Sequence, residues 1–318
     1  MTLQILMLVA GLLLILAGAN YLVDGSSSIA KRFGLSEFVI GLTIVGIGTS
    51  SPEMVVSFMS AFQGKADMAI GNVVGSNIFN TLLILGSTAL IAPLMITKEN
   101  LRRDIPLNLG VTVLLILLGL KHTIFGIGSD EISRWDGGLF LLLFVWYMWK
   151  SFSKGKVSED DEGNIKLYSM PISLLMVAGG LAALVFGGRL FVNSAVEIAK
   201  IFNISEKFIA ITVMAVGTSL QELATCIVAA FKGRGQLALG NILGSNISNI
   251  ILILGGAALI HPLSFAGITT ADLGVLLVSA IMIFISFFTF VKKKLDRVEG
   301  AIFILLGIAY MAFLIYSL

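Results

Sequence analysis

The chain consists mainly of apolar runs, each about as long as a helix that crosses a membrane. About 20 apolar residues, at a helical rise of about 1.5 Å each, span the roughly 30 Å hydrocarbon layer of a bilayer. The period-two alternation of a membrane β-barrel is not found in these runs. The sequence therefore predicts an all-α, polytopic membrane protein with ten transmembrane helices, at approximately residues 3–24, 37–62, 67–92, 104–120, 136–152, 171–192, 206–231, 236–260, 268–290 and 298–316.

The composition supports a lipid bilayer as the partner of this chain. Hydrophobic residues make up 57% of it and charged residues 13%, whereas an average globular protein has about 25% charged residues. The net charge is only +2 and the basic residues are scattered, so no nucleic-acid partner is expected. The single cysteine, Cys226, allows no internal disulfide. The N-terminal run lacks a basic start and a cleavage site, so we expect it to be retained as a helix.

The distribution of Lys and Arg predicts the orientation of the chain. With the N-terminus outside, the segments on the cytoplasmic side hold most of the basic residues, which is typical of inner loops. We therefore expect a multi-pass protein of the cell (inner) membrane with both termini extracytoplasmic. The cytoplasmic set comprises Lys31, Arg32, Lys98, Arg102, Arg103, Lys150, Lys154, Lys156, Lys166, Lys232, Arg234, Lys292, Lys293, Lys294 and Arg297, and the opposite set Lys65, Lys121, Arg134, Lys200 and Lys207.

Two motifs occur twice, separated by the same distance along the chain. The segment 48–53, GTSSPE, recurs as GTSLQE at 217–222, which is 169 residues later. The segment 71–80, GNVVGSNIFN, recurs as GNILGSNISN at 240–249 with the same shift. One offset shared by two separate motifs indicates an internal duplication.

The duplication predicts two inverted repeats of five transmembrane helices each. Five crossings are an odd number, so the second repeat must begin on the opposite side of the membrane from the first. We expect the first repeat at residues 1–153, a cytoplasmic linker at 154–169 and the second repeat at 170–318. The acidic stretch 159–162 is interpreted as part of a solvated linker, with a regulatory cation site as the alternative. Inverted repeats with matching interrupted helices are typical of transporters, whose site lies where the repeats meet near the midplane.

Two carboxylates lie deep inside apolar runs, at matched positions of the two repeats. These are Glu53 and Glu222, whereas the other acidic residues fall in predicted loops or near helix ends. A charge at the bilayer centre costs at least about 2.5–3.5 kcal/mol, so it usually has a function or a partner. Neither motif contains Lys or Arg, so a bound cation is expected to supply the missing charge. The alternative is a pair of protonated glutamates that bond across helices.

The residues before each glutamate are expected to interrupt their helix. Pro52 lacks an N–H and fits best at a helix start, so 48–52 should break the second run. Such a break frees carbonyl groups, notably those of Gly46 and Thr49, and hard cations prefer oxygen ligands of this kind. In the second motif Gln221 replaces Pro52, and the break depends on Gly217, Thr218 and Ser219.

A polar stripe is predicted on the helix that follows each glutamate. Its residues are spaced i, i+4, i+8 and therefore share one helical face. Their neutral oxygens could bind a cation without adding charge, or the Gly-x-x-x-Gly pattern and the amides could serve close helix packing. Both interpretations can hold together. The stripes are Asn72, Ser76 and Asn80 in the first repeat, and Asn241, Ser245 and Asn249 in the second.

At these paired motifs the sequence resembles the calcium/cation antiporter superfamily, in particular its prokaryotic sodium/calcium exchanger branch. The resemblance covers the whole chain. It implies alternating access, with Na⁺ and Ca²⁺ competing for overlapping sites. Matched by motif, it implies that Glu53 and Glu222 bind both ions, that Thr49 and Thr218 add backbone oxygens around Ca²⁺, that Gly46, Ser50 and Ser245 form one Na⁺ site and Ala215, Ser219 and Ser76 another, and that Asn80 and Asn249 complete the central layer.

One departure from the family pattern concerns the coupling ion. Many sodium/calcium exchangers of this family have Asp where this chain has Asn249, and calcium/proton exchangers resemble it in having Asn. Two central carboxylates then balance one Ca²⁺ or two Na⁺. We expect Na⁺ because the hydroxyl pairs Ser50/Ser219 and Ser76/Ser245 remain, with a calcium/proton antiporter as the alternative.

An enzyme is not expected. Intramembrane hydrolysis would usually need His or a metal site, and the two histidines, His122 and His261, lie near predicted helix ends without a partner motif. We expect the chain to work as a monomer whose substrates are the transported ions Ca²⁺ and Na⁺ (or H⁺), without a cofactor.

Overall fold

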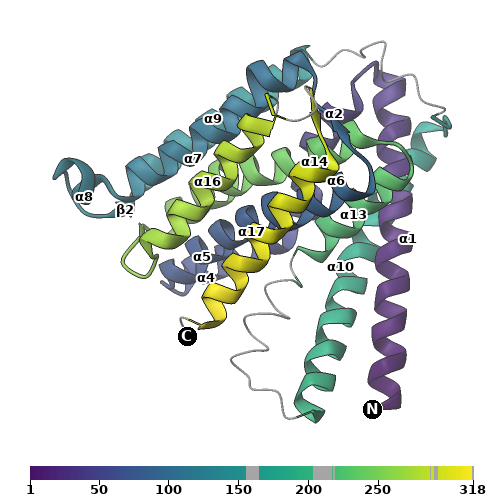
Figure 1. Cartoon of the computed structure of the whole chain (residues 1–318), viewed down its shortest axis with the longest axis horizontal. Helices are drawn as coiled ribbons and strands as arrows, with labels where there is room; N and C mark the ends of the chain where they lie inside the picture. Colours follow the sequence, from purple (N-terminus) through teal and green to yellow (C-terminus); the bar gives the residue numbers. More distant parts are fainter. Residues whose placement is uncertain (155–164, 203–216, 218, 287, 290–292, 317–318) are drawn as a thin grey trace.

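The computed structural model describes residues 1–154, 165–202, 217, 219–286, 288–289 and 293–316 (Figure 1). In this part of the chain nearly all regular structure is helical, and the strands are two residues long. Five helices are long and apolar enough to cross a membrane: Thr2–Phe33, Ala66–Ile91, Met170–Ile201, Gly235–Ile260 and Arg297–Tyr316. A sixth span is formed if the bent pair Glu37–Thr49 and Ser51–Phe62 is taken as one. The protein is therefore a mostly helical membrane protein, as predicted.

The helices α1 (Thr2–Phe33) and α10 (Met170–Ile201) lie side by side along one edge of the molecule (Figure 1). They touch through glycines: a Cβ atom on Gly18 would lie 2.8 Å from the carbonyl oxygen of Gly180, and one on Gly11 would lie 2.9 Å from that of Gly187. Because the residue number rises along α1 as it falls along α10, the two helices are antiparallel. Such close backbone approach is typical of helix pairs in membranes.

Both helices of this pair are longer than the sequence predicted. The runs 3–24 and 171–192 extend to Phe33 and Ile201. Polar residues continue α1 because they are buried in protein: Ser28 Oγ lies 2.9 Å from Ser173 Oγ of α10. The helix α1 ends at Gly34, whose positive φ of 63° is the left-handed conformation that commonly follows a helix.

The second predicted run is broken where its sequence indicated. It consists of α2 (Glu37–Ile40), the π-helical turn η1 (Gly41–Val45), α3 (Gly46–Thr49) and α4 (Ser51–Phe62). The axis bends by 48° at Ser50, and Pro52 lies in the first turn of α4. In the second repeat α13 (Leu220–Phe231) corresponds to α4, and most of the chain before it (203–216 and 218) lies outside the described residues.

The next helix of each repeat has the same irregular course. In the first repeat it is α5 (Ala66–Phe79), the π-helical turn η2 (Asn80–Leu85) and α6 (Gly86–Ile91). In the second it is α14 (Gly235–Ser248), η6 (Asn249–Leu254) and α15 (Gly255–Ile260), so every boundary is shifted by the offset of the sequence motifs. Single π-helical turns inside α-helices are frequent at functional sites.

Pairs of hydrogen bonds also repeat at this offset. Asn72 Nδ2 donates to Ser57 Oγ (3.0 Å), and at the equivalent positions Asn241 Nδ2 donates to Cys226 Sγ (3.2 Å). These contacts hold α5 against α4 and α14 against α13. Asn72 and Asn241, the first residues of the two predicted polar stripes, therefore stabilise the packing of neighbouring helices.

The remaining helices and strands complete both repeats around α14, which is buried at every residue from Leu237 to Ser248. The short strands join the halves to each other, because β1 pairs with β4 and β2 with β3, both antiparallel.

Asp136 and Glu299 cap the first turns of α9 and α17 by accepting hydrogen bonds from Ser133 N (2.8 Å) and Asp296 N (2.9 Å). The remaining helices and strands are β1 (Leu94–Met95), η3 (Asn100–Asp104), α7 (Ile105–Gly119), α8 (Lys121–Phe125), β2 (Glu131–Ile132), α9 (Arg134–Lys154), β3 (Leu263–Ser264), α16 (Thr270–Ser286), β4 (Lys294–Leu295) and α17 (Arg297–Tyr316).

Candidate functional site

The two predicted glutamates occupy equivalent positions on α4 and α13. Each lies in the first turn of its helix, directly after the repeated Gly-Thr-Ser sequence. Their side chains are almost completely buried, with 1% of Glu53 and 1% of Glu222 exposed. Negative side chains are favoured in the first turn because it is the positive end of the helix dipole, which partly offsets the cost of burying a carboxylate there.

The carboxylate of Glu222 reaches the other repeat. Its Oε1 accepts a hydrogen bond from Ser50 Oγ at 3.1 Å, and Ser50 is the residue at the bend between α3 and α4. The contact therefore joins the helix break that precedes Glu53 to the glutamate of the opposite half. Within the described part of the chain, Oε2 of Glu222 has no hydrogen bond.

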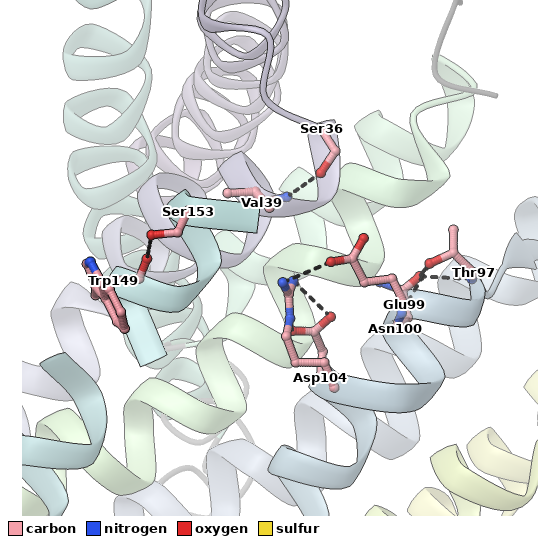
Figure 2. A network of polar contacts seen from close by, with 9 residues as sticks. Ser36, Val39, Thr97, Glu99, Asn100, Asp104, Trp149 and Ser153 are labelled. Atoms are coloured by element: carbon pink, nitrogen blue, oxygen red, sulfur yellow. Dashed lines mark hydrogen bonds and ion pairs between the residues drawn. The ribbon is translucent and has the colours of Figure 1, made fainter. Parts of the chain in front are cut away.

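Two other buried carboxylates, those of Asp104 and Glu37, have basic partners. Asp104 accepts from Arg103 Nε at 2.9 Å, and Glu37 lies 3.5 Å from Arg234 Nε. Figure 2 shows Glu99 directly before η3 and Asp104 at its end, and both carboxylates contact the Arg103 guanidinium. None of the ion pairs between described residues includes Glu222. This carboxylate is therefore buried with hydroxyl contact but without a basic counterpart in the described structure, an arrangement suited to a cation.

Further oxygen atoms link the broken helix to α14. Ser245 Oγ donates to the Gly46 carbonyl (3.2 Å), and Thr49 Oγ1 lies 3.1 Å from Asn241 Oδ1. The Gly46 carbonyl also accepts from Ser50 N at 3.2 Å, so in this conformation the helix bend does not free it as the sequence interpretation assumed. A cation at Gly46 would have to share or replace these bonds.

The asparagines at the ends of the two stripes begin the π-helical turns. Asn80 starts η2, which contacts α13, and Asn249 starts η6, which contacts α4. Each asparagine thus lies on an element packed against the glutamate helix of the opposite repeat. Both are buried, and Oδ1 of each has no hydrogen bond within the described chain. These oxygens are free to bind a cation without adding charge.

The structure thus describes ten of the twelve predicted site residues and leaves Ala215 and Thr218 outside the described residues. The buried hydroxyls of Ser76 and Ser219 lie on α5 and directly before α13, and Ser219 Oγ has no hydrogen bond within the described chain. The ten described residues are Gly46, Thr49, Ser50, Glu53, Ser76, Asn80, Ser219, Glu222, Ser245 and Asn249.

Three buried polar residues beside this site were not singled out from the sequence. Asn77 and Asn246 are the Asn of the repeated Gly-Ser-Asn triplet, and the side chain of each donates a hydrogen bond to the opposite repeat. Asn246 Nδ2 donates to Thr81 Oγ1 at 2.9 Å. Both copies of the motif have Asn at this position, residues 77 and 246, and this identity was the sequence signal that could have pointed to them.

The chain is similar to known proteins over most of its length. A family model described as sodium/calcium exchanger protein matches residues 3–152 and 172–316. The chain belongs to the sodium/calcium exchanger family. The two matched ranges leave residues 153–171 of the exchanger between them.

Individual relatives match most of the exchanger. The sodium/calcium exchanger MaX1 of Methanosarcina acetivorans is 33% identical, with 99% of both chains covered. The inner membrane protein YrbG of Escherichia coli is 37% identical over 82% of this chain and 81% of its own. A solved structure of the sodium-calcium exchanger NCX_Mj, soaked with 2.5 mM Na⁺ and 0.1 mM Ca²⁺, matches with a TM-score of 0.84 at 32% identity, covering 98% of each chain.

These relationships place the exchanger among membrane transporters and not among enzymes. Its substrates are accordingly cations, and its reaction is cation/calcium antiport.

Proposed function

We propose that this exchanger moves Ca²⁺ against Na⁺ by alternating access, at a central site that includes Glu53 and Glu222. The observation that carries the proposal is the 3.1 Å contact between Ser50 and Glu222, because it joins the matched motifs of both repeats. Two carboxylates in a buried site require positive charge, and Ca²⁺ or two Na⁺ ions supply it. The name of the relative MaX1 supports Na⁺ as the counter-ion.

The proposed ligand set follows the motif. Neutral oxygens surround the two carboxylates, which suits hard cations such as Ca²⁺, whose shell holds about 6–8 oxygens. Hydroxyl groups from both repeats could bind the singly charged Na⁺ ions without adding negative charge. We assign Glu53, Glu222, Thr49 and Thr218 to Ca²⁺, Gly46, Ser50 and Ser245 to one Na⁺ site, Ala215, Ser219 and Ser76 to the other, and Asn80 and Asn249 to the central layer.

The proposed architecture is ten transmembrane helices in two inverted repeats, residues 1–153 and 170–318, joined by a cytoplasmic linker at 154–169. The antiparallel packing of the equivalent helices α1 and α10 supports this inversion, because inverted repeats place equivalent helices in opposite directions across the membrane. The strand pairs that connect the halves support the same symmetry. We place the protein in the inner membrane as a monomer, with both termini extracytoplasmic.

In the proposed cycle, Ca²⁺ and the counter-ion occupy the site in turn, so that binding of one expels the other. An empty site would leave the buried Glu222 carboxylate without a cation in a medium of low dielectric constant, which disfavours the crossing conformation. The α1 and α10 pair, which lies at one edge of the molecule (Figure 1), would slide over the other helices as the gate.

A calcium/proton antiporter is the second candidate. The neutral Asn249, where many sodium/calcium exchangers have Asp, is the observation that favours it. In that case the two glutamates would carry protons in place of Na⁺.

A gradient experiment distinguishes the two coupling ions. Purified exchanger in liposomes loaded with Na⁺ should take up ⁴⁵Ca²⁺ when diluted into medium without Na⁺. With equal Na⁺ on both sides, a pH gradient of the same free energy should drive no uptake. Uptake driven by the pH gradient alone would contradict Na⁺ coupling, and no uptake under either gradient would contradict antiport itself.

A further inference from the structure

We infer that Asn77, which lies outside the ligand set, is a positioning residue that turns the amide oxygen of Asn249 toward the transported cation. The inference rests on the proposed function, because it takes Asn249 as a cation ligand. Both side chains are buried, Asn77 on α5 of the first repeat and Asn249 at the start of η6 in the second.

The orientation of Asn77 is determined by an atom that can only accept. Its Nδ2 lies 3.0 Å from the backbone carbonyl oxygen of Asn246. An amide oxygen in that place would face another oxygen, so the nitrogen of the Asn77 amide must point to Asn246. The Oδ1 atom of Asn77 consequently points away from this carbonyl.

The orientation of Asn249 follows from that of Asn77. The Asn77 Oδ1 atom is an acceptor, and the atom of Asn249 that lies 3.0 Å from it is Nδ2. Reversing the Asn249 amide would place two oxygens in contact. The donor of Asn249 is therefore used inside the protein, whereas its Oδ1 stays buried without a hydrogen bond in the described chain. The hydrogen bond from Asn77 thereby leaves the oxygen of the Asn249 amide, and not its N–H groups, available for a cation.

The two repeats differ at this point for a reason visible in the sequence. Asn246 is the counterpart of Asn77, but its Nδ2 donates to Thr81 Oγ1 at 2.9 Å. The position equivalent to Thr81 is Ile250, which has no acceptor in its side chain. Asn77 therefore turns to the backbone of Asn246, and no side-chain hydrogen bond between Asn80 and Asn246 is found in the described structure. Among the described residues, Asn249 is held by an asparagine of the opposite repeat and Asn80 is not.

The test is the variant Asn77→Ala with Asn246→Ala as its matched control. Both changes remove one buried asparagine that bridges the repeats, but only the first releases the Asn249 side chain. We expect Asn77→Ala to raise the KM for Ca²⁺ in ⁴⁵Ca²⁺ uptake about threefold to tenfold, the usual value of one neutral hydrogen bond, with the maximal rate changed less than twofold. Asn246→Ala should change the KM less than twofold.

A double-mutant cycle shows whether Asn77 acts through Asn249. In an Asn249→Ala background, Asn77→Ala should raise the KM no further, because the amide that it positions is absent. An unchanged KM in Asn77→Ala, or the same increase in both backgrounds, would overturn the inference. Equal increases in Asn77→Ala and Asn246→Ala would also overturn it, since they would indicate only loss of packing.

Failure of the proposed function would look different from these outcomes. If the exchanger does not transport Ca²⁺, unaltered protein in the same liposomes gives no KM to compare. Transport by unaltered protein with an unaffected Asn77→Ala variant would reject only the positioning role.

Discussion

Glu222→Gln and Glu53→Gln should each lower Na⁺-driven Ca²⁺ transport at least about a hundredfold. Glutamine keeps the shape of glutamate and one oxygen that can bind a cation, but it removes one of the two negative charges at the site. Removing one partner of a buried pair of opposite charges, here a carboxylate and its cation, typically costs about 3–5 kcal/mol. A difference of about 1.4 kcal/mol corresponds to a factor of ten. The initial rate of ⁴⁵Ca²⁺ uptake into Na⁺-loaded liposomes measures the effect.

Glu299→Gln is a suitable control for these variants. Glu299 is also a buried glutamate in the first turn of a helix, but it accepts hydrogen bonds from Thr289 and Asp296 on its own half and lies outside the proposed site. Its variant should transport within about threefold of the unaltered rate. Normal transport in both Glu53→Gln and Glu222→Gln would refute the two-glutamate site.

Exchange should be electroneutral, with two Na⁺ ions moved for each Ca²⁺. Two carboxylates balance two positive charges, and the held amide of Asn249 adds none. A third Na⁺ would move one net charge per cycle, and 100 mV acting on one charge is worth about 2.3 kcal/mol. In such a cycle, a potential of 100 mV would change the Ca²⁺ accumulation ratio by a factor of about 50. For the electroneutral cycle, we expect the same potential to change this ratio less than about twofold.

Paired isotope fluxes under a potassium-diffusion potential measure this directly. The ratio of ²²Na⁺ to ⁴⁵Ca²⁺ movement should be two, and uptake should be the same with the potential positive or negative inside. A ratio of three together with strong voltage dependence would show that another group supplies the charge that Asn249 lacks.

Much of the fold and part of the site could be predicted because local chemistry determines them. Pro52 lacks the N–H that would continue the preceding helix, so the bend at Ser50 could be predicted from the position of this proline in the sequence. The shared offset of the motifs predicted that α4 and α13 would begin at equivalent residues, and they do. The burial of Glu53 and Glu222 followed from the apolar runs around them.

Other features depend on contacts that a sequence does not specify. Asn72, Ser76 and Asn80 share a helical face. The spacing alone could not tell that Asn72 binds Ser57, whereas the Asn80 oxygen has no hydrogen bond from the residues that the structure describes. The role of Asn77 arises from the carbonyl of Asn246 on another helix, which only the folded structure brings within reach. The extension of α1 beyond residue 24 depends likewise on burial against α10.

Equilibrium ⁴⁵Ca²⁺ binding to the purified exchanger tests the central site most directly. Unaltered protein should bind one Ca²⁺ per chain, Na⁺ should displace it competitively, and the double variant Glu53→Gln/Glu222→Gln should bind none at the same concentration. Ca²⁺ binding that survives in the double variant, or that Na⁺ leaves unchanged, would contradict a shared site built on two buried carboxylates.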